Sequence, residues 1–130
     1  MTLEEELKLL QHRLALVDLQ VVLQAMARDG ILPLLVMKLK ALKVKMYQEA
    51  GHRLPHVHID YGPRHHVASY SISEPKRLAG TLDAKYDREV VGWIAGCRDK
   101  LLELWRSVQS GRYPSVVIGE LKGEGEYREV

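Results

Sequence analysis

The spacing of apolar residues changes period along the chain, and this change constrains the fold more than any other feature. Residues 3–26 repeat apolar side chains every three or four positions, which is the period of a helix. Residues 42–47 and 56–61 instead alternate apolar and polar side chains, as half-buried strands do. A helical period returns over residues 87–110. A helix, then strands, then a helix in this order predict an α+β fold.

The middle of the chain is expected to form a small antiparallel sheet. Two further strands are predicted at residues 66–72 and 77–82. The turn residues Gly62 and Pro63 separate the strand at 56–61 from the strand at 66–72. We therefore predict a meander of three or four strands, with one amphipathic C-terminal helix packed on it. Residues 113–118, "YPSVVI", are a possible final edge strand.

The N-terminal helix is expected to associate with another chain. Thr2 and Glu5 have capping-box spacing, and the helix should end near Gly30. A second apolar stripe joins the first in the later half of the helix, and one sheet with one further helix can hardly cover both. We expect a homo-oligomer or a partner protein here, whereas packing on the chain's own sheet is the simpler alternative. The expected contact residues form a heptad seam of Leu3, Leu7, Leu10, Leu14, Val17 and Val21.

Three segments are expected from these patterns: an association helix at residues 1–30, an α+β domain at 31–118 and a loose tail at 119–130. The tail carries more charge and glycine than apolar residues.

Composition places the chain among ordinary globular proteins. Its 130 residues can bury one core, and 46% hydrophobic with 28% charged residues is typical of that class. Cys97 is the single cysteine, so no intramolecular disulfide can form. The first residues are acidic, and no apolar run approaches the roughly 20 residues that a membrane span needs. We expect a cytoplasmic protein with no membrane partner.

Five of the six histidines lie within residues 52–66. On a strand, His56 and His58 would project from one face, roughly 7 Å apart, with Asp60 continuing the row. Two imidazoles at this spacing suit a divalent transition metal such as zinc. If the following turn closes a hairpin, one of the next two histidines returns beside Asp60. The candidate metal ligands are His56, His58 and His65.

The same face has two other interpretations. His56 and His58 can act as catalytic acid and base on a phosphodiester, with a basic residue holding the phosphate. Residues 31–58 carry five Lys or Arg against Glu49 alone, so nucleic acid is a possible partner. The plainer interpretation is a solvated strand face with no site. The candidate binding residues are Lys45, Arg53, Asp60 and Tyr61.

Four segments of the chain resemble a family of short bacterial proteins, the domain-of-unknown-function family 4160. They are "KVKMYQEAGHRLPHVHIDYG", "ASYSI", "RLAGTL" and "VVGWIAGCRDKLLELW". The family pattern is matched by the Pro55-His56-Val57-His58 segment, by Tyr61-Gly62, by Gly80-Thr81-Leu82 and by the residues from Leu101 to Trp105. A histidine that is common on the helix is Cys97 here, so a site that needs this third imidazole is incomplete.

The resemblance implies a fold and a partner more than an activity. Family members often look like one component of a toxin–antitoxin-type gene pair, which would suit the apolar N-terminal helix. Our leading hypothesis is a protein-binding, regulatory component of such a pair, with the face of His56 and His58 as its functional surface. The alternatives are a metal- or histidine-dependent phosphodiesterase acting on RNA, and a structural oligomer without a catalytic site.

Overall fold

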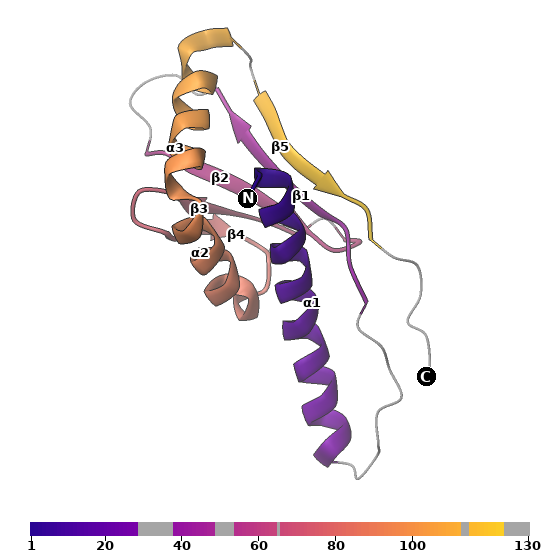
Figure 1. Ribbon diagram of the computed structural model, residues 1–130. Coiled ribbons are helices and arrows are strands. Elements are labelled where there is room, and N and C mark those ends of the chain that lie inside the picture. The colour runs from indigo at the N-terminus through magenta and orange to yellow at the C-terminus, as the bar shows by residue number, and fades with distance from the viewer. Residues whose placement is uncertain (29–37, 49–53, 65, 113–114, 124–130) are drawn as a thin grey trace.

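The fold is described from a computed structural model, in which residues 1–28, 38–48, 54–64, 66–112 and 115–123 are described. Over these ranges, three α-helices cover one face of a five-stranded sheet (Figure 1). In chain order the elements are α1 (Leu3–Arg28), β1 (Leu42–Tyr47), β2 (His56–Tyr61), β3 (His66–Ser71), β4 (Lys76–Gly80), the short turn η1 (Ala84–Tyr86), α2 (Asp87–Gly96), α3 (Arg98–Ser107), the short turn η2 (Val108–Arg112) and β5 (Ser115–Leu121). The predicted α+β fold is confirmed.

The sheet is antiparallel throughout and has the order β4-β3-β2-β1-β5. The first four strands form the predicted meander, and β5 returns to pair with β1. The predicted final edge strand is therefore present. It runs to Leu121, past the expected boundary at residue 118, and a register shift between Val44 and Lys45 marks its pairing with β1.

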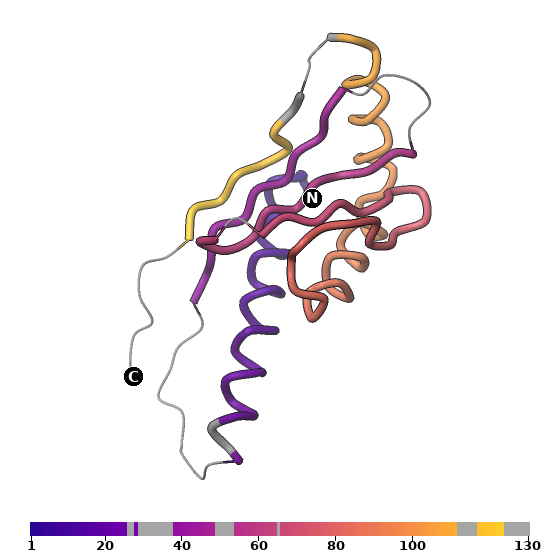
Figure 2. Tube along the Cα trace, turned by 180° about the vertical axis from the view of Figure 1, so that it is seen from behind, coloured from indigo at the N-terminus to yellow at the C-terminus, as the bar shows by residue number. Residues whose placement is uncertain are grey.

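Alternation along the strands separates a buried face from an open one. The helices lie over the buried face, and Figure 2, seen from behind, shows the opposite face with no described helix over it. Side chains two apart on a strand share a face, so on β1 and β2 a polar set points away from the core. The buried set, each member at most 3% exposed, is Leu42, Val44, Met46, Val57, Ile59, Tyr61, Ala68 and Tyr70.

The C-terminal helical segment differs from the prediction of one helix. It is two helices, because Cys97 leaves the helical conformation with φ −120° and ψ 24°. Its N–H donates to the carbonyls of Trp93 and Ile94, which ends α2. The preceding Gly96 is a poor helix former, so it favours a break at this point.

The first half of α1 packs in the core of the same chain. Leu7, Leu10 and Leu14 are at most 1% exposed, and Leu3 and Val17 pack at the margin of this core. The helix approaches β5 closely, because a Cβ added at Gly119 would lie only 2.3 Å from Leu7 Cδ2. Five of the six residues of the predicted seam, Leu3 through Val17, thus pack within the chain, and Val21 is the one that is exposed.

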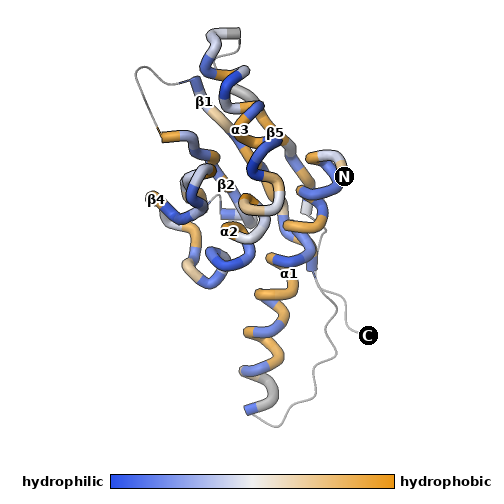
Figure 3. Tube along the Cα trace, turned by 60° about the vertical axis from the view of Figure 1, so that its left-hand side comes forward, coloured by the Kyte–Doolittle hydropathy of each residue, from blue (hydrophilic) through white to orange (hydrophobic). Residues whose placement is uncertain are grey.

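The second half of α1 extends past the sheet (Figure 1). Apolar stretches continue along it in Figure 3, and Leu16 and Val21 are 48% and 47% exposed. In the described part of the chain, no helix has both the length and the apolar character that crossing a membrane requires.

Candidate functional site

The open face of β2 carries His56, His58 and Asp60, as the alternation predicts. The ring centroids of the two histidines lie 5.1 Å apart, and the ring of Tyr47 lies 4.8 Å from that of His58. Nδ1 of His56 lies 2.8 Å from the carbonyl oxygen of Leu54. Because a carbonyl only accepts, Nδ1 carries the proton, and Nε2 of a neutral His56 ring is then basic.

Strand pairing surrounds these histidines with basic and hydroxyl side chains. Lys45 lies opposite His58 on β1, and Ser69 lies opposite it on β3. Lys43 pairs in the same way with Asp60. A shallow cavity of about 130 Å³ lies among Lys43, Lys45, Tyr47, His58, Asp60 and Val67. We call Lys43, Lys45, Tyr47, His56, His58 and Asp60 the histidine face. It combines two imidazoles with two ammonium groups, which suits acid–base chemistry or contact with an anion.

Not every predicted site residue joins this face. Tyr61 points to the opposite, buried side and is 3% exposed. His66 pairs with Tyr61 rather than with Asp60, so it does not return beside the acid. Arg53 and His65 lie outside the described residues.

A metal site receives no support from the described residues. Among them, no three His, Cys, Asp or Glu side chains are arranged to hold a metal ion. His56 and His58 therefore have no described third ligand, and the predicted zinc ligand His65 lies outside the described residues.

A second polar cluster, which sequence reasoning missed, lies on the helix side around Asp18 of α1. Asp18 is 6% exposed, and its Oδ2 accepts a hydrogen bond from the hydroxyl of Tyr61 at 3.0 Å. Its Oδ1 accepts from the hydroxyl of Tyr86. Lys40 Nζ lies 3.1 Å from Oδ2, and Lys85 Nζ lies 3.2 Å from Oδ1. One buried carboxylate is thus shared by two phenols and two ammonium groups.

These contacts keep Asp18 charged. Burial by itself would raise its pKa, but hydrogen bonds from Tyr86 and Lys40, together with the charge of Lys40, outweigh burial and hold the pKa below its ordinary value of 3.8. The sequence carried one signal for this cluster. Asp18 is the only acid in the apolar second stretch of the helix, residues 14–23, and a buried acid needs partners.

The two lysines also lie over aromatic rings. Lys40 Nζ is 5.8 Å from the centroid of Tyr61, and Lys85 Nζ is 5.1 Å from that of Tyr86. The two rings meet edge to face, 5.1 Å apart. A cavity of about 430 Å³, which we call the Asp18 pocket, opens above this cluster. Its lining includes Lys40, Tyr61, Arg64, His66, Lys85 and Tyr86.

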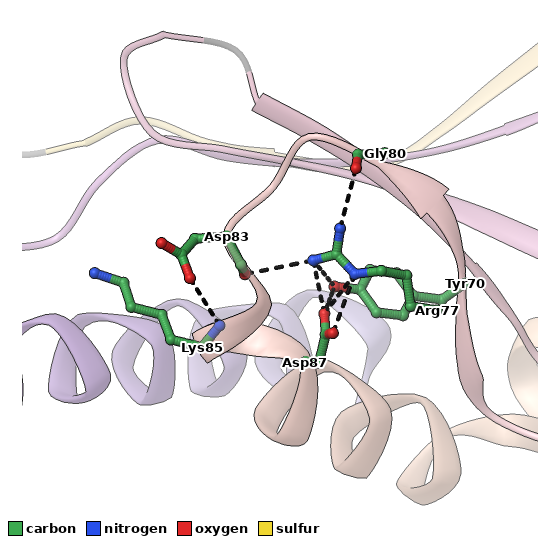
Figure 4. A network of polar contacts seen from close by, with 6 residues as sticks. All are labelled: Tyr70, Arg77, Gly80, Asp83, Lys85 and Asp87. Atoms are coloured by element: carbon green, nitrogen blue, oxygen red, sulfur yellow. Dashed lines mark hydrogen bonds and ion pairs between the residues drawn. The ribbon is translucent and has the colours of Figure 1, made fainter.

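One wall of the Asp18 pocket is fixed by an ion pair between β4 and α2 (Figure 4). Arg77 Nε donates to both carboxylate oxygens of Asp87, at 2.8 and 3.1 Å. Tyr70 donates to the same carboxylate at 2.6 Å. Further N–H groups of Arg77 donate to the carbonyls of Gly80 and Asp83, each at 3.4 Å. This network holds the segment from β4 to η1, which carries the pocket residues Thr81, Leu82, Asp83, Lys85 and Tyr86.

The chain can now be placed among known proteins. A family model for a domain of unknown function, DUF4160, matches residues 42–106. The chain belongs to this family. The DUF4160 region contains the whole histidine face and, of the Asp18 cluster, Tyr61, Lys85 and Tyr86. Asp18 and Lys40 lie outside it, so the acid that orients these DUF4160 side chains comes from the preceding helix. Comparisons with curated proteins and with solved structures give no match.

Proposed function

We propose that this DUF4160 protein is a binding and regulatory module, one component of a toxin–antitoxin-like pair, that holds its partner protein through the outer half of α1. We define the outer half of α1 as residues 16–25. The observation that supports this proposal is the exposure of Leu16 and Val21 on α1, at 48% and 47%. The toxin–antitoxin link rests on the family resemblance.

Covering these side chains would favour association. Full burial of a Leu or Val side chain is worth roughly 1.5–3 kcal/mol, and Leu16 and Val21 are each about half exposed. Each would therefore contribute about 1 kcal/mol to an interface. An amphipathic helix that lies in a partner's groove, or against a second helix, is a common way to bury such positions.

Charge substitutions in the outer half of α1 test this proposal. The double variant Leu16→Glu and Val21→Glu should lose its partner, because two carboxylates would be buried at the contact. The double variant Ala95→Glu and Ser107→Glu is the matched control, since it adds the same charge at two exposed helix positions outside the outer half of α1. Co-expression with the product of the adjacent gene, followed by affinity purification and light scattering, gives the readout.

The outcomes separate clearly. Retention of the partner by the control and its loss from the Leu16→Glu, Val21→Glu variant would support the proposal. A wild-type chain that recovers no partner and scatters light as a monomer would contradict it. Equal binding by both double variants would place the contact elsewhere.

The histidine face supports a second candidate function, a histidine-dependent phosphodiesterase acting on RNA. The specific observation is that the rings of two half-buried histidines, His56 and His58, lie 5.1 Å apart, with Lys45 opposite His58. The His56 ring also packs against Trp105 of α3, 5.1 Å between centroids. In such a reaction one imidazole accepts the proton of the attacking hydroxyl, and the other donates a proton to the leaving oxygen. Lys45 would stabilise the charge on the phosphate.

RNA cleavage in the presence of a metal chelator tests this candidate. His56→Ala and His58→Ala should each abolish cleavage, and activity should show a bell-shaped pH dependence. His12→Ala is the control, because His12 is an exposed histidine on α1, away from the histidine face, and its Nδ1 lies 2.9 Å from the carbonyl oxygen of Lys8. Intact RNA with wild-type protein would exclude this activity.

A further inference from the structure

The Asp18 pocket has features that neither the partner-binding helix nor the histidine face uses. Its volume of about 430 Å³ falls within the range of small-molecule sites. Its lining comes from several parts of the chain, including Lys40, the turn after β2 and the segment that joins β4 to α2. The turn after β2 contributes Gly62, Pro63 and Arg64. The pocket is therefore built by the tertiary fold and not by one local motif.

Positive charge prevails in the pocket. Its lining carries Lys40, Arg64 and Lys85 against a single carboxylate, Asp83. When His66 is neutral, the lining has a net charge of +2, and Asp18, which lies beneath the pocket, lowers the net charge to +1. Asp83 accepts a hydrogen bond at 2.9 Å from the backbone N–H of Lys85, so part of its charge is already engaged in capping η1.

Asp18 fixes the ammonium groups of Lys40 and Lys85 in place but does not occupy all of their N–H donors. An ammonium group has three N–H donors, and the contact with Asp18 occupies one donor of each lysine. Lys40 and Lys85 keep about a quarter and a third of their side-chain surface exposed, at 26% and 36%. Because both lysines are held from below by a buried carboxylate, little side-chain entropy remains to be lost when an anion binds.

We propose that the Asp18 pocket binds a small phosphomonoester through Lys40, Lys85 and Arg64. A phosphoryl group offers three terminal oxygens, which matches three cationic groups that come from different elements. Leu82 and Pro63 supply apolar lining for the organic part, and the pocket has the size of a small-molecule site. This binding does not depend on the function proposed for α1.

Titration of the isotope-labelled full chain, followed by nuclear magnetic resonance, tests the site. The probes are inorganic phosphate, adenosine 5′-monophosphate and adenosine. We expect the backbone signals of Gly62, Thr81 and Lys85 to shift with both phosphate-containing probes and not with adenosine. The monophosphate should bind more tightly than phosphate, and added salt should weaken both.

Two variants and one control assign the binding to the pocket. Lys85→Met and Arg64→Ala should each weaken monophosphate binding by about tenfold or more, the effect of losing one charge-assisted hydrogen bond. Arg64 is exposed, so its removal leaves the fold intact even if Lys85→Met does not. Lys76→Met removes an equal charge from an exposed position of β4 that lies outside the pocket lining and the histidine face, and it should leave binding unchanged.

Three results would overturn the proposal. Absence of any shift with phosphate and with the monophosphate would exclude the site. Wild-type affinity in Arg64→Ala, or a loss as large in Lys76→Met, would place the binding elsewhere. A monophosphate that binds no more tightly than phosphate would exclude the ester as the ligand.

Discussion

Among the glycines that the structure describes, Gly80 is the one where an added methyl group should cost the most. It ends β4 with φ +126°, a conformation that residues with a side chain rarely adopt. A Cβ there would lie 2.3 Å from the carbonyl oxygen of Val67 and 2.4 Å from Cα of Ala68. Both are backbone atoms of β3, so the clash can be relieved only by moving a strand.

The cost of Gly80→Ala can be added from its parts. Overpacking against a fixed neighbour costs about 1–3 kcal/mol. The unfavourable backbone conformation adds about 1–2 kcal/mol. The N–H of Thr81 donates to the same Val67 carbonyl at 2.8 Å, and weakening this bond adds about 1 kcal/mol. We expect the free energy of unfolding to fall by about 3–6 kcal/mol, a large share of the 5–15 kcal/mol of a typical domain.

Gly92→Ala is the matched control because it makes the same chemical change in open space. Gly92 is an exposed residue of α2, and an added Cβ there meets nothing within 4 Å. Alanine should therefore stabilise the protein, by about 0.5–1 kcal/mol. Urea unfolding monitored by far-ultraviolet circular dichroism measures both variants. A loss below about 1 kcal/mol for Gly80→Ala, or shifts of the same sign in both variants, would refute the reasoning.

Three further predictions follow from the buried groups. The pKa of Asp18 is lowered in the folded chain, so its contribution to stability is complete above the ordinary value of 3.8 and is lost as the pH falls through the folded pKa; urea unfolding below pH 4 should show this loss, and Asp18→Asn should flatten the profile. Burial, together with the charge of Glu6, raises the pKa of Cys97 to about 12, so a thiol reagent should label it only after denaturant is added; rapid labelling of the native chain would contradict its 3% exposure. Leu10→Ala, at a side chain with no exposed surface, should cost about 2–5 kcal/mol in the same unfolding assay, whereas Leu9→Ala, at a position 43% exposed, should cost far less.

The features that the sequence predicted well depend on short-range periodicity. A strand places residues two apart on one face, so the open positions of His56 and His58 followed from the sequence without knowledge of any neighbour. The buried positions of Val57 and Ile59 followed in the same way. The final strand was also predictable, because the apolar run at residues 116–118 needs no distant partner to be recognised.

The features that were missed depend on contacts between distant residues. The pairing of His66 with Tyr61 is set by the β2–β3 register, which the turn residues alone did not fix. The partners of Asp18 lie 43 and 68 positions away, at Tyr61 and Tyr86, so no local pattern joins them. The break at Cys97 was hidden because the apolar stripe continues across it into α3.

The pairing of β5 with β1 joins strands that are separated by most of the chain, and it has a consequence for biosynthesis. While the polypeptide is being made, β1 through β4 can pair as each emerges, but one side of β1 must wait for the final strand. During that interval the backbone of β1 offers unpaired donors and acceptors to any neighbouring nascent chain. A polypeptide that terminates before Ser115 would lack β5, and this edge of β1 would stay unpaired. Premature termination should therefore favour aggregation.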